Sequence, residues 1–260
     1  MVRCSRLVVA LLMLLVQPAG VWADLIITEK VVSKAGDRSV EGRRSTSIKG
    51  MRMRIDLVQD GRSRATVYDL PAGAIIELDA RKKQARVSDV AARNTQLQKK
   101  YPRERASTKL TLTGATNTVA GLSCEEYTFT VLVPLTTDGK TSLTMNGAAC
   151  LAADAAGVAA YQSFTQAAYE RQLVVGYASD NLLLLALTRG QTELYRALVT
   201  TRGIPLRVDM TIGVDGKGMV AGMVRKVLAG TRVSTVTTIE VLPLEDALFA
   251  IPADWKRDRK

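Results

Sequence analysis

Apolar and polar residues alternate along much of the chain. In residues 51–57, MRMRIDL, the apolar side chains lie on one face of an extended chain and the charged side chains on the other. This pattern is typical of half-buried antiparallel strands. It recurs in residues 74–80, 84–90, 109–114, 125–131, 142–147, 205–212 and 232–241. Turn-forming pairs such as Asp60-Gly61 separate several of these segments, so the pattern predicts a meandering antiparallel sheet.

Two stretches have helical rather than strand periodicity. Residues 155–178 are rich in alanine, with Phe164 among the apolar residues at helical spacing, and residues 188–201 repeat that spacing. The apolar run 182–187 between them is far too short to cross a bilayer. We expect it to pack into the core, with a partner-binding or membrane-touching lip as the alternative. Sheet, helices and sheet in succession indicate an α+β fold. Because no repeat or linker interrupts them, we expect residues 24–260 to form a single β-rich domain.

The first 23 residues have the composition of a secretory signal peptide. Two arginines precede an apolar run that begins at Leu7, and small residues follow it. The run is about ten residues long, shorter than the roughly 20 of a transmembrane helix. We expect cleavage after Ala23 and a periplasmic or secreted protein, with a retained N-terminal anchor as the alternative.

Removal of the signal peptide leaves Cys124 and Cys150 as the only cysteines. In an exported chain, such a pair predicts one structural disulfide. Closing a loop of about 26 residues stabilises a fold by roughly 3.5 kcal/mol in the chain-entropy model. Two free thiols or a redox pair are the alternative, but the chain has neither C-x-x-C spacing nor a histidine that would lower a thiol pKa.

The chain contains no histidine, which removes Ser-His-Asp and Cys-His catalysis and His-based zinc or haem ligation. An enzyme would need carboxylates, lysine or tyrosine instead. Glu125 and Glu126 are adjacent in a predicted strand and point to opposite faces, so they do not suit an acid and base pair. We identify no catalytic residue, no metal site and no cofactor site, and we predict that the protein is not an enzyme.

The glycine-rich segment GVDGKG, residues 213–218, lacks the Lys-Ser/Thr pair of a phosphate-binding loop. It also lacks the spaced oxygen ligands of a calcium loop. We expect Asp215 and Gly216 to form the turn of a β-hairpin.

Basic residues are concentrated in the first part of the mature chain. Residues 24–110 hold 20 Lys and Arg against 11 Asp and Glu, whereas residues 111–260 hold 14 of each kind. This excess would attract an anionic surface of the cell envelope, such as lipid headgroups. Nucleic acid is not expected as a partner, because the chain is exported and carries no recognition motif. A basic surface without a specific partner is the alternative.

Four segments carry a resemblance to a known family. They are VAGLSCEEYTF (119–129), MNGAACLAADAAG (145–157), GIPLRVDMTI (203–212) and EVLPLEDALFAIPADWK (240–256). The chain resembles an uncharacterised family of secreted bacterial proteins, similar in fold to the periplasmic lipoprotein carriers of the outer-membrane lipoprotein sorting type. The resemblance implies a curved antiparallel sheet that wraps around helices as an unclosed barrel. It supplies no catalytic residue.

The resemblance also implies roles for individual residues. Leu248, Phe249 and Ile251 would seat the last segment in the core. Cys124 would staple its strand to the strand or edge that ends at Cys150, where a half-open barrel would otherwise have a loose edge.

Two functions from different classes fit these observations. In the first, the concave face binds a lipid, another amphiphile or a lipid-modified protein in a cavity. The residues expected to line that cavity are Met53, Ile55, Leu206, Val208 and Met210. In the second, the core is filled and the protein is a structural or interaction protein of the envelope, which recognises a partner through a sheet edge or the 182–187 lip. A ligand-sized cavity would favour the first. The sequence carries no signal for the oligomeric state.

Overall fold

A computed structural model describes residues 24–173 and 182–259 of the chain, so the predicted signal peptide, residues 1–23, lies outside the described residues. The strands are β1 (Leu25–Ala35), β2 (Arg38–Lys49), β3 (Arg52–Gln59), β4 (Arg62–Asp69), β5 (Ala74–Asp79), β6 (Gln84–Asp89), β7 (Ser107–Val119), β8 (Leu122–Pro134), β9 (Ser142–Ala152), β10 (Ile204–Asp215), β11 (Gly230–Val241) and β12 (Lys256–Arg259). The helices are α1 (Val90–Lys100), α2 (Val158–Glu170), α3 (Leu182–Val199) and α4 (Met219–Leu228), with short 3₁₀ turns η1 (Arg103–Arg105) and η2 (Asp246–Phe249).

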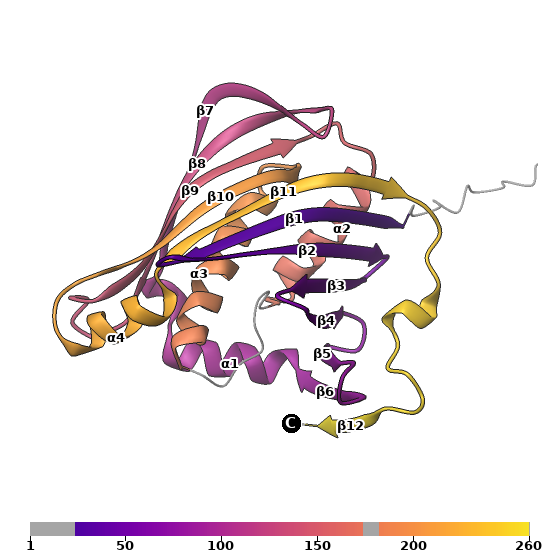
Figure 1. Cartoon of the computed structure of the whole chain (residues 1–260), viewed down its shortest axis with the longest axis horizontal. Helices are drawn as coiled ribbons and strands as arrows, with labels where there is room; N and C mark the ends of the chain where they lie inside the picture. Colours follow the sequence, from indigo (N-terminus) through magenta and orange to yellow (C-terminus); the bar gives the residue numbers. More distant parts are fainter. Residues whose placement is uncertain (1–23, 174–181, 260) are drawn as a thin grey trace, which may run out of the picture.

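All these strands belong to one sheet, in the order β12-β6-β5-β4-β3-β2-β1-β11-β10-β9-β8-β7. The pairs are antiparallel except β12 with β6, which is parallel. The sheet is curved and does not close, so β12 and β7 are its edges, and α2 and α3 lie within the curve (Figure 1). The predicted α+β fold with an unclosed barrel is confirmed.

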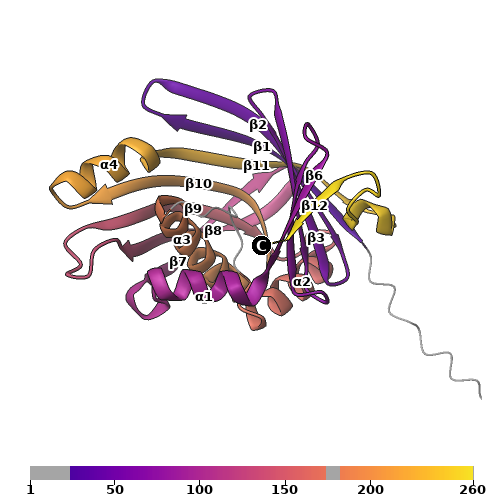
Figure 2. The ribbon, with the colours of Figure 1, turned by 90° about the horizontal axis from the view of Figure 1, so that it is seen from below.

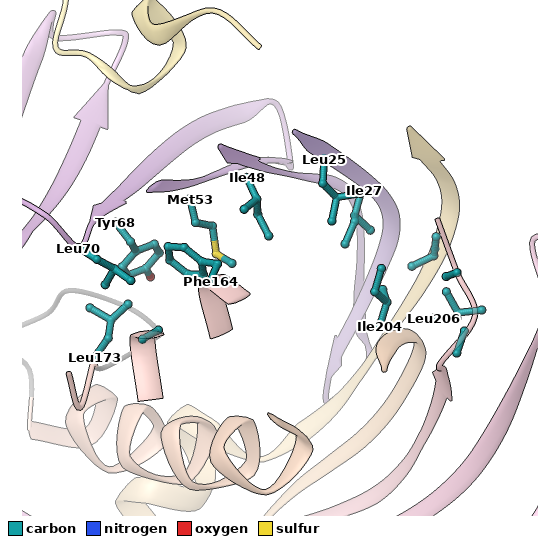
Figure 3. Packing of buried hydrophobic residues seen from close by; sticks show 14 of the residues in the cluster. Leu25, Ile27, Ile48, Met53, Tyr68, Leu70, Phe164, Leu173, Ile204 and Leu206 are labelled. Atoms are coloured by element: carbon teal, nitrogen blue, oxygen red, sulfur yellow. The ribbon is translucent and has the colours of Figure 1, made fainter. Parts of the chain in front are cut away.

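One face of β1 to β4 forms an apolar layer on the concave side of the sheet. Ile48 of β2 pairs with Leu25 of β1 on one side and with Met53 of β3 on the other. Met53 in turn pairs with Tyr68 of β4, and all four side chains are buried. They surround Phe164 of α2, which is fully buried (Figure 3). Full burial of such a side chain contributes about 1.5–3 kcal/mol, so this layer fixes the position of α2 against the sheet.

The structure contains a helix, α1, that the sequence pattern did not predict. The helix begins directly after β6, where the Asp89 side chain accepts a hydrogen bond from the backbone N of Ala92 at 2.8 Å. Only Val90 and Leu97 of this helix are buried. Two buried residues in eleven leave too weak a periodicity for recognition, and local capping defines the start of the helix instead.

The other central helices differ from the prediction in their bounds. α2 ends at Glu170, and residues 174–178 of the predicted first helix lie outside the described residues. α3 begins at Leu182, so the apolar run 182–187 is the first part of this helix rather than a connecting segment. Leu185 and Ala186 are buried against the sheet, as expected of a run that packs into the core.

The prediction of a hairpin turn at Asp215 and Gly216 was wrong. β10 does end at Asp215, but the chain then forms α4 before β11 begins (Figure 1). The helix escaped recognition because it has apolar residues on two faces. Val224 is buried, whereas Met219 and Met223 are exposed.

The chain after β11 forms a strap, residues 244–259, across the convex face of β4 to β6. Phe249 is buried there beside Val67 of β4, and Leu248 and Ile251 pack against the same cluster. The predicted seating of these residues is confirmed, and the structure shows that their core is the outer one. β12 then pairs with β6 and completes the sheet.

Candidate ligand-binding cavity

A cavity of about 840 Å³ lies between the concave face of the sheet and the helices α2 and α3. One wall comes from β1 to β6, β10 and β11, and the other from α2 and α3. Small-molecule sites typically have volumes of about 300–1,000 Å³. The space is therefore large enough for a ligand of that class.

The cavity has apolar walls on both sides. The apolar lining residues are Ile27, Met53, Ile55, Leu57, Leu78, Leu194, Leu198, Ile204, Val208 and Met210. Strand alternation brings the sheet residues together, because Ile55 pairs with Thr46 of β2 and Thr66 of β4, and all three face the cavity. Leu194 and Leu198 are one helical turn apart on α3 and therefore share the opposite wall.

Four of the five residues predicted to line a cavity do so. Met53 and Ile55 lie on β3, and Val208 and Met210 lie on β10. Leu206 is fully buried in the core and is not part of the lining. Three strands separate β3 from β10 in the sheet, so these residues meet across the curve rather than side by side. Contact of these residues with a ligand stays a prediction.

The solvent end of the cavity is strongly basic. The basic rim consists of Arg62, Arg64, Arg81, Lys82 and Arg86, all of them exposed. Lys82 lies 3.7 Å from the Asp79 carboxylate and Arg86 lies 3.7 Å from that of Glu77. Among the residues that the structure describes, Arg62, Arg64 and Arg81 make no ion pair. The rim therefore offers positive charge to an anionic group.

A buried ion pair lies inside the cavity. Arg44 of β2 donates from Nη2 to Oε1 of Glu29 at 2.7 Å, and its Nε donates to the other carboxylate oxygen. The Glu29 side chain is only 7% exposed. Such a pair is tolerated in the interior only when both partners remain together, because an unpaired buried charge is strongly destabilising.

Helices α2 and α3 contribute polar side chains to the same cavity. Burial raises the pKa of the Tyr161 phenol, and the nearby Glu29 carboxylate raises it further. Burial also raises the pKa of Tyr195, one helical turn from Gln191. Both phenols therefore stay protonated at neutral pH. The Tyr195 hydroxyl oxygen and the Gln191 Oε1 atom are buried without a hydrogen-bond partner in the described part of the chain.

The opposite face of α3 is anchored by a buried charge cluster. Arg189 donates from Nη1 to Glu193 and from Nε to the carbonyl oxygen of Tyr101, each at 2.9 Å. Arg196 donates to the same Glu193 oxygen at 3.1 Å. Because Tyr101 caps the end of α1, the cluster ties α3 to α1 and holds Leu194 against the cavity.

Cys124 of β8 and Cys150 of β9 form a disulfide, with their Cα atoms 5.3 Å apart. Glu126 pairs with Cys150 in the strand register, so the two cysteines lie diagonally across neighbouring strands. Both are buried in the core that contains Phe164. The bridge joins strands inside the sheet and does not reach the edge strand β7, so the expectation that it secures a loose edge was wrong.

Sequence reasoning missed the polar groups of this cavity. One signal was present, because Glu29 occupies a position that the alternation of Leu25, Ile27 and Val31 assigns to the buried face of β1. A charged residue at such a position indicates a buried ion pair or a functional site. No comparable signal marks Tyr195, because polar residues on a helix ordinarily face water.

No family model matches the chain, and no curated protein matches it in sequence. Similar solved structures include an uncharacterized conserved protein from Thermus thermophilus, with 9% identity, a TM-score of 0.39 and 92% of each chain covered. A putative outer membrane lipoprotein-sorting protein domain from Vibrio parahaemolyticus has 8% identity and a TM-score of 0.33, over 88% of this chain and 89% of that chain. A DUF1329 family protein from Desulfovibrio piger has 10% identity and a TM-score of 0.31, over 88% of this chain and 90% of that chain. At these identities and TM-scores the likenesses carry no argument about function, which has to come from the cavity itself.

Two further observations concern the described residues alone. In residues 24–173 and 182–259, no three His, Cys, Asp or Glu side chains come together in a way that would hold a metal ion. No helix of this part of the chain is long and apolar enough to cross a membrane.

Proposed function

We propose that the protein binds an anionic amphiphile, such as a lipid or the acyl chain of a lipid-modified protein, in the cavity of its half-barrel. The observation that carries this proposal is an 840 Å³ space with apolar walls that ends in a rim of exposed cations. The apolar walls suit a hydrocarbon chain, and the unpaired arginines suit a negatively charged head. Export through the predicted signal peptide would place this activity in the periplasm or outside the cell.

The two parts of the cavity make separable contributions to affinity. Each CH₂ group removed from water contributes about 0.8 kcal/mol, whatever the salt concentration. The unbranched side chains of Met53 and Met210 can repack around chains of different shape. Attraction of the head by Arg62, Arg64 and Arg81 falls as salt rises, because exposed charges are screened. Affinity should therefore fall as the salt concentration rises and level off at the value that burial of the ligand's hydrocarbon chain provides.

A fluorescent fatty acid, dansyl-undecanoic acid, tests the proposal by titration of the protein without its signal peptide. Ile55→Arg puts a charge into the apolar wall and should weaken binding at least about tenfold. Val58→Arg is the matched control, because Val58 lies on the opposite face of β3 and is 49% exposed. The control should bind like the wild type.

A second pair of variants tests the basic rim. Arg62→Glu with Arg64→Glu should weaken binding at low salt and remove most of the salt dependence. Native mass spectrometry of protein from its own host would then distinguish a free lipid from a lipid-modified protein by mass. Absence of any bound amphiphile, together with no probe binding by the folded wild type, would leave the envelope interaction protein as the better hypothesis.

A further inference from the structure

Helix α4 carries an exposed apolar stripe that the cavity does not explain. Met219, Met223 and Val227 are 89%, 55% and 56% exposed. They follow one another at intervals of four residues, so they lie along one face of the helix. Val224 and Leu228 are buried on the other face and hold α4 in place. The stripe is therefore a stable surface feature of a well-packed helix.

The charged residues of α4 and of the two residues before it are all positive. On the helical wheel Lys226 lies about 20° from Met219, at the edge of the stripe, and Lys217 lies two residues before the helix. Both lysines are exposed, and the helix itself contains no acidic residue. An apolar face with lysines beside it is suited to an anionic bilayer surface, where apolar side chains enter the headgroup layer and cations meet the lipid heads.

The strand registers place α4 at the same end of the sheet as the basic rim. Lys34 pairs with Thr231, which brings the β1–β2 and β10–β11 connections together. Gly42 pairs with Gln59, so the β3–β4 turn lies at this end as well. Ala65 of β4 pairs with Leu78 of β5, so the β5–β6 turn, which carries Arg81 and Lys82 of the rim, also lies at this end. The two views agree that α4 lies at the far end of β10 and β11 (Figures 1 and 2).

The cavity extends toward this end of the sheet. Met210 of β10 pairs with Arg232 of β11, and both residues line the cavity. The next pair on the same face of the sheet is Ile212 with Gly230, where β11 begins after α4. The stripe therefore lies just beyond the wall that β10 and β11 form, at the same end of the sheet as the rim.

We infer that this end of the half-barrel docks on an anionic membrane surface, with the α4 stripe in the headgroup layer and the basic rim on the lipid heads. In this orientation an amphiphile passes between bilayer and cavity without crossing bulk water. The docking rests on α4 and the rim alone, whereas the transfer step rests on the proposed function.

Vesicle co-sedimentation tests the docking. The wild type should bind phosphatidylcholine vesicles that contain phosphatidylglycerol, bind pure phosphatidylcholine vesicles weakly, and dissociate as salt is added. Met219→Asp with Met223→Asp should lower the bound fraction at least about fivefold, because it replaces the apolar contact with negative charge. Val241→Asp with Leu242→Asp is the matched control, since these exposed residues lie at the other end of β11. The control should bind vesicles like the wild type.

Transfer of dansyl-undecanoic acid from the same vesicles tests the second step. The stripe variant, Met219→Asp with Met223→Asp, should take up the probe from vesicles several-fold more slowly than the wild type. Its affinity for the probe in water should equal that of the wild type. If the wild type fails to bind the probe in water, the proposed function and the transfer step fall and docking is judged from sedimentation alone.

Three results would overturn the docking itself. The first is a wild type that does not bind anionic vesicles. The second is a folded Met219→Asp and Met223→Asp variant that binds them as well as the wild type. The third is a dimer in sedimentation velocity that this variant abolishes, because a second copy of the chain would then cover α4.

Discussion

Glu29 is a charged residue at a position that the alternation of its strand assigns to the core. It lies between Ile27 and Val31 on the buried face of β1, and Arg44 neutralises it from the neighbouring strand. The pair faces the cavity beside Tyr161. The ion pair therefore places two opposite charges among the apolar and threonine side chains of this wall.

Glu29→Gln should lower the free energy of unfolding by about 3 kcal/mol, because it removes the carboxylate that binds the partly buried Arg44 guanidinium through two of its nitrogen atoms. Urea unfolding followed by circular dichroism measures this loss. The double variant Glu29→Met with Arg44→Leu is the control, and it should recover most of the stability. Equal stability of the single and double variants would show that the pair has little net coupling.

Removal of either of two buried oxygen atoms on α3 is expected to raise the stability of the protein. Tyr195→Phe and Gln191→Met remove oxygens that have no partner in the described part of the chain. Each change should stabilise the empty protein by about 1 kcal/mol, since an unsatisfied buried polar atom costs roughly 1–3 kcal/mol. Thermal unfolding measures the effect, with Tyr127→Phe as the control, because the Tyr127 hydroxyl donates an exposed hydrogen bond to Glu125. A clear loss of stability would reveal a partner for these atoms.

At the scale of elements, the C-terminal strap is held by apolar packing and by the ion pairs of two exposed carboxylates, Asp246 and Asp254. Asp246 lies 2.7 Å from Arg52, and Asp254 lies 2.9 Å from Lys83. Hydrogen bonds from Lys49 and Arg52 lower the pKa of Asp246 below its usual value of 3.8. A hydrogen bond from Lys83 likewise lowers the pKa of Asp254 below 3.8.

These lowered pKa values predict that the strap loosens in acid. A carboxyl group with a depressed pKa stabilises the folded state fully above its unfolded pKa and loses that contribution as the pH falls through the folded value. The attachment should therefore be constant above about pH 5 and weaken progressively below about pH 4. Trp255 lies in the strap and is the only tryptophan after Ala23, so its fluorescence reports the change.

Asp246→Asn with Asp254→Asn is the control for the acid effect. This variant should lose the part of the fluorescence change that begins near pH 4, while its spectrum at low pH matches that of the wild type. An unaltered acid transition in the variant would assign the effect to other carboxylates.

The β8–β9 hairpin is the second element with a measurable contribution. Cys124→Ala with Cys150→Ala should lower the free energy of unfolding by about 3.5 kcal/mol in the chain-entropy model. The sequence separation of 26 residues sets this value, and urea unfolding with and without reductant measures it. The variant should match the reduced wild type; a difference between them would show that the lost sulfur packing in the core matters as well.

Elements with a strict alternation were predictable, and those with a mixed face were not. β3 was recognised because Met53 and Ile55 are separated by charged residues. β2 escaped because Arg44 and Thr46 occupy its cavity-facing positions. α4 escaped because methionines cover its solvent face. The residues that the pattern missed line the cavity or form the exposed face of α4. They break the alternation of polar and apolar residues that a simple core would produce, as residues of functional surfaces often do.

At the scale of the whole molecule, local patterns indicate strands and helices but not the order of the strands. The fold class followed from periodicity and resemblance. The cavity did not, because it depends on how far the sheet curves between β3 and β10 and on how closely α3 approaches it. Those distances result from contacts between residues far apart in the chain, which a pattern of neighbours does not contain.

The position of β1 inside the sheet has a consequence for how the chain folds. Strands β1 to β6 are neighbours both in the sequence and in the sheet, so they can pair early in folding. The other side of β1 pairs with β11, where Leu25 meets Val241, and stays unpaired until almost the whole chain has been delivered. Pulsed hydrogen exchange during refolding should therefore show protection of β3 to β5 before β10 and β11, and simultaneous protection would contradict it. Until then the open side of β1 is a site for aggregation, so a chain of this design should depend on a holding chaperone while it folds.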